Sequence, residues 1–151
     1  MNKNSSLKFI DSHCHLDFPE LKLNIDEILK LSSLKNVKKI ITICTKLSEL
    51  EKIIKISNKY KNIWFTAGIH PHEASHEVSS FDMNNLLNIV SKNEKCVGIG
   101  EAGLDLFYKK SSFNDQKQSF LMQIEVARKS NKPIVIHSRD ADEEMIDILV
   151  Y

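Results

Sequence analysis

The chain has little of what marks several classes of protein. Its 151 residues include only three cysteines, Cys14, Cys44 and Cys96, which lie far apart with no C-x-x-C pair. This spacing argues against a disulfide framework and favours a reducing compartment. No stretch approaches the roughly 18 consecutive apolar residues of a membrane-spanning helix, and residues 1–6 lack the apolar core of a signal peptide. We therefore expect a cytoplasmic protein with no membrane partner.

An excess of charge of one sign is also lacking. Lys and Arg together number 21 and Asp and Glu 20, which gives a formal net charge of +1. The net charge therefore gives no evidence for a polyanionic partner, although a local basic patch could still bind nucleic acid. The hydrophobic fraction of 42% and the charged fraction of 27% are ordinary for a globular protein. Length and composition together predict one domain over residues 1–151.

What the sequence does have is a regular alternation of strand-like and helix-like segments. Five short segments rich in Ile and Val are typical of buried strands: Phe9–His13, Lys39–Cys44, Ile63–Ile69, Cys96–Glu101 and Pro133–His137. Helical spacing of apolar residues follows in the intervals, over Ile25–Leu31, Leu47–Tyr60, Met83–Val90 and Gln116–Lys129, and a last helix begins over Glu143–Leu149. This alternation predicts an α/β fold with a parallel sheet covered by helices.

The spacing of the strands favours a barrel over an open sheet. Successive strands begin about 31 residues apart, and eight such units would need about 250 residues, the usual size of a TIM (β/α)8 barrel. The sequence holds five strands and ends within a helical pattern at Val150 and Tyr151. We expect such a barrel truncated after about five β/α units. The alternative is a complete five-stranded flavodoxin-like domain, which fits the candidate site residues less well.

Histidines cluster at the ends of the predicted strands, where barrels of this kind carry their function. His13 and His15 form an H-x-H at the end of the first strand. Side chains two apart on a strand share a face, so both imidazoles can aim at one point and form half of a metal site. His137 ends the fifth strand in the same way. A lone strand histidine is usually a core residue, but coincidence at several strand ends favours metal binding.

Glu101 closes the fourth strand in the run Gly98-Ile99-Gly100-Glu101-Ala102-Gly103-Leu104-Asp105. Its carboxylate has two oxygens and can bridge two metal ions about 3.5–4 Å apart. We therefore predict Glu101 as the central catalytic residue and Asp105 as a residue that orients a ligand or a water. The alternative for Glu101 is an exposed carboxylate in a turn or a partner of a helix N-cap. Histidines around one carboxylate suit Zn or Mn, and more water and carboxylate ligands would suit Mg.

Three further residues are predicted to contact a substrate. Arg139 follows the fifth strand and can hold a phosphate by paired hydrogen bonds. The same charged run could instead begin a helix, with Asp140 as its cap. His70 and His72 lie in a loop fixed by Pro71, and we predict that they contact substrate rather than metal.

Four stretches together resemble the TatD family of metal-dependent hydrolases, the TatD-like deoxyribonucleases among the metallo-dependent hydrolase barrels. They are Asp11–Asp17 (DSHCHLD), Gly68–His72 (GIHPH), Gly98–Asp105 (GIGEAGLD) and Pro133–Arg139 (PIVIHSR), in family order along nearly the whole chain. Together these motifs are specific, whereas any one alone is weak.

The resemblance implies two divalent metal ions, one held by His13, His15 and Glu101 and the other by Glu101 and His137. It implies attack of a metal-bound hydroxide on the phosphorus of a phosphodiester, with DNA as the substrate. A related variant of the same chemistry would hydrolyse a small amide, ester or aminoacyl bond. The family also implies a further His after the sixth strand and an Asp after the eighth, and this sequence contains neither strand.

An unclosed barrel would leave its first and fifth strands as bare edges. We therefore expect the 151 residues alone to be marginally stable, to associate through these edges and to bind metal weakly. The alternative function is a catalytically inactive half-barrel that works only with a complementary C-terminal chain.

Overall fold

Five parallel strands form one sheet whose spatial order follows the chain. The strands are β1 (Phe9–Cys14), β2 (Val37–Thr42), β3 (Ile63–Ala67), β4 (Cys96–Asp105) and β5 (Ile134–Arg139). They are seen in a computed structural model that describes residues 7–150. Residues 1–6 and Tyr151, which bear on the predictions about a leader and about the end of the last helix, lie outside the described residues.

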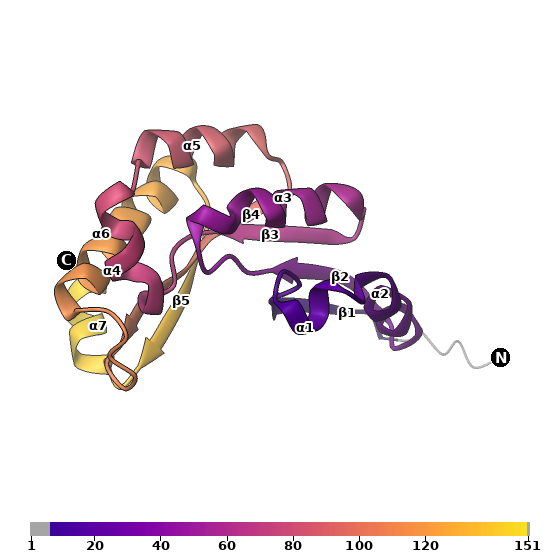
Figure 1. The fold of residues 1–151 in the computed structure, drawn as a ribbon, viewed down its shortest axis with the longest axis horizontal. Helices are drawn as coiled ribbons and strands as arrows, with labels where there is room; N and C mark the ends of the chain where they lie inside the picture. The colour runs from indigo at the N-terminus through magenta and orange to yellow at the C-terminus, as the bar shows by residue number, and fades with distance from the viewer. Residues whose placement is uncertain (1–6, 151) are drawn as a thin grey trace.

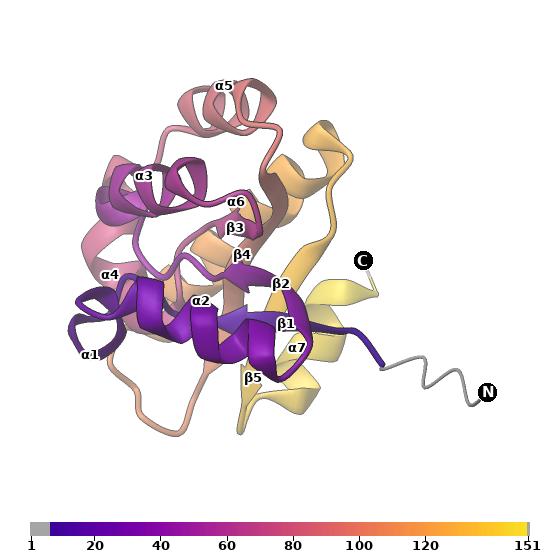
Figure 2. The same ribbon diagram turned by 90° about the vertical axis from the view of Figure 1, so that its right-hand side faces the viewer.

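Helices connect the strands and lie along the sheet (Figures 1 and 2). The α-helices are α1 (Pro19–Lys22), α2 (Ile25–Leu34), α3 (Leu50–Lys59), α4 (Ala74–Glu77), α5 (Met83–Lys92), α6 (Phe113–Ser130) and α7 (Asp142–Leu149). The 3₁₀ turns are η1 (Leu47–Glu49), η2 (Pro71–Glu73) and η3 (Val78–Ser80). No helix within residues 7–150 is long and apolar enough to cross a membrane.

Local capping explains where α6 begins but not where α7 begins. Helix α6 begins earlier than the apolar spacing predicted, because the Ser112 side chain accepts a hydrogen bond from the Asp115 amide. Helix α7 begins at Asp142 with Ala141 at its N-cap, so Asp140 does not cap it. The short helices α1 and α4 carry too few residues to show a helical period, and the apolar pattern did not predict them.

The strand order confirms the barrel and excludes the flavodoxin-like alternative. All four neighbouring pairs are parallel, and the order is β1-β2-β3-β4-β5. A flavodoxin-like sheet would have the order 2-1-3-4-5 with helices on both faces. A sequential order is that of consecutive β/α units around a barrel. The described residues therefore form a half-barrel.

The prediction of five buried strands was wrong for β1. Five of its six residues are exposed and none is buried, whereas β4 is buried along nearly its whole length. β1 pairs only with β2, so one of its edges and much of its surface have no packing partner among the described residues. β5, at the opposite edge, is likewise half exposed. Buried apolar packing concentrates between the helices and the inner strands β2, β3 and β4, with residues such as Phe65, Ile99 and Phe120.

Two irregularities in the strand pairing lie where the predicted site residues lie. Between Asp11 and Cys14, β1 advances three residues against two on β2, and β4 does the same against β5 between Ile99 and Ala102. A β-bulge of this kind redirects a side chain and is common beside active sites. Glu101 falls in the second bulge, next to Gly100, whose φ of 120° favours glycine. The carboxylate is therefore positioned by an irregularity of β4.

Candidate metal centre

The carboxyl ends of the strands bring most of the predicted site residues into one open cleft of about 620 Å³. Its lining includes His15, Phe18, His70, His72, Glu101, Asp105, His137 and Arg139. A larger groove of about 830 Å³ runs between α3 and α5, and none of the predicted site residues lines it. The chemistry-bearing side chains are therefore concentrated at one end of the sheet.

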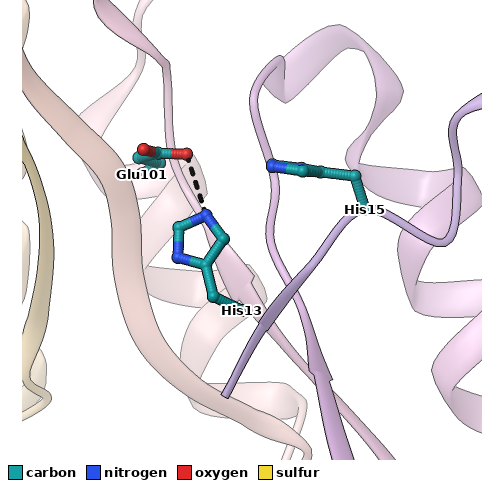
Figure 3. A group of neighbouring side chains, drawn as sticks. All are labelled: His13, His15 and Glu101. Atoms are coloured by element: carbon teal, nitrogen blue, oxygen red, sulfur yellow. Dashed lines mark ion pairs between the residues drawn. The ribbon is translucent and has the colours of Figure 1, made fainter. Parts of the chain in front are cut away.

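His13, His15 and Glu101 form the first group of potential metal ligands (Figure 3). His13 Nε2 lies 3.3 Å from Glu101 Oε2. The His15 ring stacks on Phe18 at 4.6 Å, and its Nδ1 lies 3.2 Å from the carbonyl oxygen of Ile43. Because a carbonyl can only accept, Nδ1 carries the proton and Nε2 keeps a free lone pair, which is the tautomer that a metal ligand needs.

His70, Glu101 and His137 form a second group on the other side of the same carboxylate. His137 Nδ1 lies 3.0 Å from Glu101 Oε1 and 3.2 Å from His70 Nε2. His70 Nδ1 accepts the backbone N–H of His72, so a neutral His70 carries its proton on Nε2, directed at His137. His137 Nδ1 cannot accept that proton and also donate to Glu101. A cation held by His137 Nδ1 and Glu101 Oε1 would take the place of the proton between them, while His137 Nε2 keeps its proton toward Asp105, so these two donors fit a divalent metal ion. His70 Nε2, which carries a proton, has no lone pair for the ion.

Asp105 connects the histidines of β5 and of the η2 turn. Its buried Oδ2 lies 2.7 Å from His72 Nε2 and 3.2 Å from His137 Nε2, while Oδ1 accepts the backbone N–H of Tyr108. His137 is thus placed between two carboxylates, Glu101 and Asp105. A carboxylate on the outer nitrogen fixes the ring orientation of an imidazole and raises its basicity.

The electrostatics of the centre favour ionised carboxylates. Burial raises the pKa of Glu101, but the hydrogen bond with His137 and the nearby His70 and His13 outweigh burial and hold it below its usual value. The hydrogen bond with Glu101 raises the pKa of His137, with Asp105 adding to the effect. Burial also raises the pKa of Asp105, yet the Tyr108 amide, His72 and His137 leave it lowered overall. Both carboxylates are therefore charged at neutral pH.

Arg139 lies at the rim of this cleft rather than inside the cluster. Its guanidinium carbon is 5.1 Å from the centre of the Tyr108 ring, and Arg139 is exposed. The Tyr108 ring also meets His72 edge to face at 5.5 Å. An exposed guanidinium beside the cleft can reach an anionic group bound there.

All the residues predicted from the sequence as metal ligands or substrate contacts lie at this end of the sheet. The distances between them do not by themselves say which bind metal and which contact substrate. The prediction missed how close His70 lies to His137 and Glu101. A signal was available, because His70 follows the third strand much as His13 ends the first. The contact itself depends on the turn at Pro71, which the sequence pattern does not describe.

The metal-free protein should lose stability as the pH falls from about 6.5 to about 4, because burial lowers the pKa of His70 to about 4 from its ordinary 6.5. Between these values His70 is neutral when folded and protonated when unfolded, so unfolding takes up a proton and becomes easier in acid. One proton gives at most about 1.4 kcal/mol per pH unit, and the partial exposure of His70 makes the effect smaller.

We expect His70→Gln to flatten this pH dependence in urea unfolding measured with chelator, and His76→Gln, at an exposed histidine, to leave it unchanged. The raised pKa of His137 acts with the opposite sign, stabilising below about 6.5 and fading as the pH rises, so it does not account for a loss of stability in acid. An equally steep acid loss in His70→Gln would contradict the assignment to His70.

A half-barrel with histidines and a shared carboxylate at its strand ends defines a class, the metal-dependent hydrolases built on (β/α)8 barrels. Comparison with known proteins identifies the family within that class. Residues 10–151 match the model of the TatD related DNases, and the chain belongs to this family.

Individual relatives agree with this assignment. The chain is 38% identical to an uncharacterized metal-dependent hydrolase of Buchnera aphidicola, over 93% of this chain and 56% of that protein. It is 29% identical to the human deoxyribonuclease TATDN3, over 93% of this chain and 55% of that protein. The crystal structure of the TatD homologue YjjV of Escherichia coli superposes with a TM-score of 0.80 at 26% identity, covering 92% of this chain and 54% of YjjV. The chain thus spans about half the length of these relatives.

Proposed function

We propose that the centre holds two divalent metal ions, zinc, manganese or magnesium, and hydrolyses phosphodiester bonds of DNA. The observation that carries the proposal is the placement of Glu101, whose Oε2 faces His13 at 3.3 Å while Oε1 faces His137 at 3.0 Å. One carboxylate between two groups of imidazoles is the arrangement that a bridging ligand needs. His13, His15 and Glu101 would hold one ion, and Glu101 and His137 the other.

The metal ions would lower the pKa of a bound water and offset charge on the attacking and leaving oxygens. The protein side chains would do the rest. Asp105 keeps His137 oriented, His70 and His72 contact the substrate beside the second group, and Arg139 holds a phosphate at the rim. The human relative is named a deoxyribonuclease, which supports DNA as the substrate class. The related alternative is a small amide or ester, which would use the same centre without needing Arg139.

A second candidate is a half-barrel that is inactive alone and needs a complementary chain. The specific observation in its favour is the exposure of apolar residues on the two edge strands, with Phe9 51%, Ile10 59% and Ile136 42% exposed. Open edges of this kind pair readily with another chain or with a second copy. The chain also spans about half the length of its relatives, so further ligands would come from outside residues 1–151. We propose that residues 1–151 form one structural unit of such a site.

We also propose a cytoplasmic location. Cys14, Cys44 and Cys96 are all free, as a reducing compartment would allow.

The test is hydrolysis of a fluorescent DNA oligonucleotide by the purified chain with Mn²⁺, Zn²⁺ or Mg²⁺ and after chelation, beside a small ester and a small amide. We expect metal-dependent cleavage of DNA that Arg139→Gln weakens and that the Arg128→Gln control, at the other arginine, does not. Cleavage of the ester alone would favour the small-molecule substrate. Metal binding without hydrolysis of any substrate would favour the incomplete half-barrel, and absence of metal binding would refute a two-metal centre formed by these residues alone.

A further inference from the structure

Two glutamines of α6 are buried although their amides are polar. Gln116 is 1% exposed and Gln123 is 0% exposed, and the two lie on one face of the helix about two turns apart. Burying an amide is costly unless all its polar atoms find partners. The partners of these two side chains therefore show what the helix contributes besides packing.

Gln123 binds both backbone polar groups of Ile69. Its Oε1 accepts the Ile69 N–H at 2.9 Å, and its Nε2 donates to the Ile69 carbonyl at 3.0 Å. The second Nε2 hydrogen is donated to Ser119 Oγ at 3.1 Å, one turn earlier on α6. Ile69 directly precedes His70 and lies beyond the end of β3, so the strand ladder does not hold it.

Gln116 binds Asp105 in the same way. Its Oε1 accepts the Asp105 N–H at 2.8 Å, and its Nε2 donates to the Asp105 carbonyl at 3.2 Å and to the Ser111 carbonyl at 2.9 Å. Asp105 pairs with Arg139 of β5 on one side, but β3 ends at Ala67 and gives no strand partner on the other. The side-chain amide thus takes the place of a neighbouring strand.

Each side-chain amide therefore fixes a backbone segment next to a side chain of the metal centre. Beyond Ile69 lies His70, whose Nε2 is 3.2 Å from His137 Nδ1. Beyond the Asp105 backbone lies its carboxylate, at 2.7 Å from His72 and 3.2 Å from His137. A plain apolar residue would pack equally well against the sheet but would leave these backbone groups without partners.

We infer that Gln116 and Gln123 are positioning residues that set the placement of Asp105 and of His70 in the centre. The predicted effect of the glutamines on metal affinity rests on the proposed function, whereas their effect on the positions of the side chains does not require metal. Asp105 and His70 both contact His137, which is one of the proposed ligands, and such outer partners of a metal ligand typically contribute about 10–100-fold to metal affinity.

The test compares Gln123→Met and Gln116→Met, which keep the side-chain volume, with Gln118→Met at an exposed glutamine of the same helix. Leu86→Ala, at a buried residue of α5, controls for a general loss of stability. If either buried substitution fails to fold, Gln→Asn at that position keeps an amide that is too short to reach the backbone. The chain contains six histidines, so their imidazole resonances can be assigned by single substitutions.

In the metal-free protein we expect Gln123→Met to shift the imidazole resonances of His70, and Gln116→Met to shift those of His72 and His137. The resonances of His13 and His15 should stay within the range of the two controls. With Mn²⁺ added, the concentration that half-broadens the His70 and His137 resonances should rise about tenfold in Gln123→Met.

The inference would be overturned if Gln116→Met and Gln123→Met gave the same imidazole spectra and Mn²⁺ titrations as Gln118→Met and differed from it only by a lower melting temperature, as Leu86→Ala does. Both glutamines would then have a purely structural role. If Mn²⁺ broadens no histidine in the unsubstituted chain, the proposed function fails. The metal-free spectra would still decide whether the glutamines position the side chains.

Discussion

Glu101→Gln is expected to remove metal binding from both groups of ligands at once. The substitution keeps the size of the side chain but exchanges a charged carboxylate for a neutral amide. Because His13 faces one Glu101 oxygen and His137 the other, neither group keeps an anionic ligand from this position. We expect affinity to fall by at least about 100-fold, beyond the usual effect of an outer hydrogen-bond partner. Calorimetric titration with Mn²⁺ or Zn²⁺ measures the affinity and the number of ions bound.

The matched control is Glu94→Gln, at an exposed glutamate just before β4, which should leave both quantities unchanged. His13→Ala provides a further distinction, because it should weaken only the group that contains His15. DNA cleavage, where present, should disappear in Glu101→Gln. Two ions bound with unchanged affinity in Glu101→Gln would remove the bridging role, and unchanged cleavage in both variants would identify a contaminating nuclease.

Gly103→Ala is expected to unfold the chain or to destabilise it by at least about 3 kcal/mol, a large share of the 5–15 kcal/mol typical of a domain. Gly103 has a φ of 147°, and a Cβ built there would lie 2.0 Å from the His137 carbonyl oxygen. The obstacle is backbone of the neighbouring strand β5, so it cannot be relieved by rotation of a side chain. Relief requires β5 to move, together with the imidazole of His137.

Gly98→Ala in the same strand is the control. Its Cβ would meet the Pro133 carbonyl oxygen at 3.3 Å, and its backbone has no left-handed φ, so we expect a cost of only about 1 kcal/mol. Urea unfolding followed by circular dichroism measures both variants, and failure to recover folded Gly103→Ala would agree with the expectation. Equal stability of the two alanine variants would contradict it.

The sequence by itself determined the class of fold and the placement of most candidate residues. Strand and helix periods are local, so they predicted the five parallel strands and the intervening helices of a half-barrel. The residues His13, Glu101 and His137 could be placed because each ends an apolar segment, and strand ends of parallel sheets meet at one edge.

Only the tertiary structure decided how these side chains meet. The bulge that positions Glu101 is a matter of register between β4 and β5, and register depends on two segments at once. The proximity of His70 to His137 likewise depends on a turn and on the buried Gln123. The exposure of β1 could not be predicted from its apolar composition, because burial depends on what packs against a strand. Local pattern fixes which residues can reach a strand end, whereas distances between strands follow from packing across the whole chain.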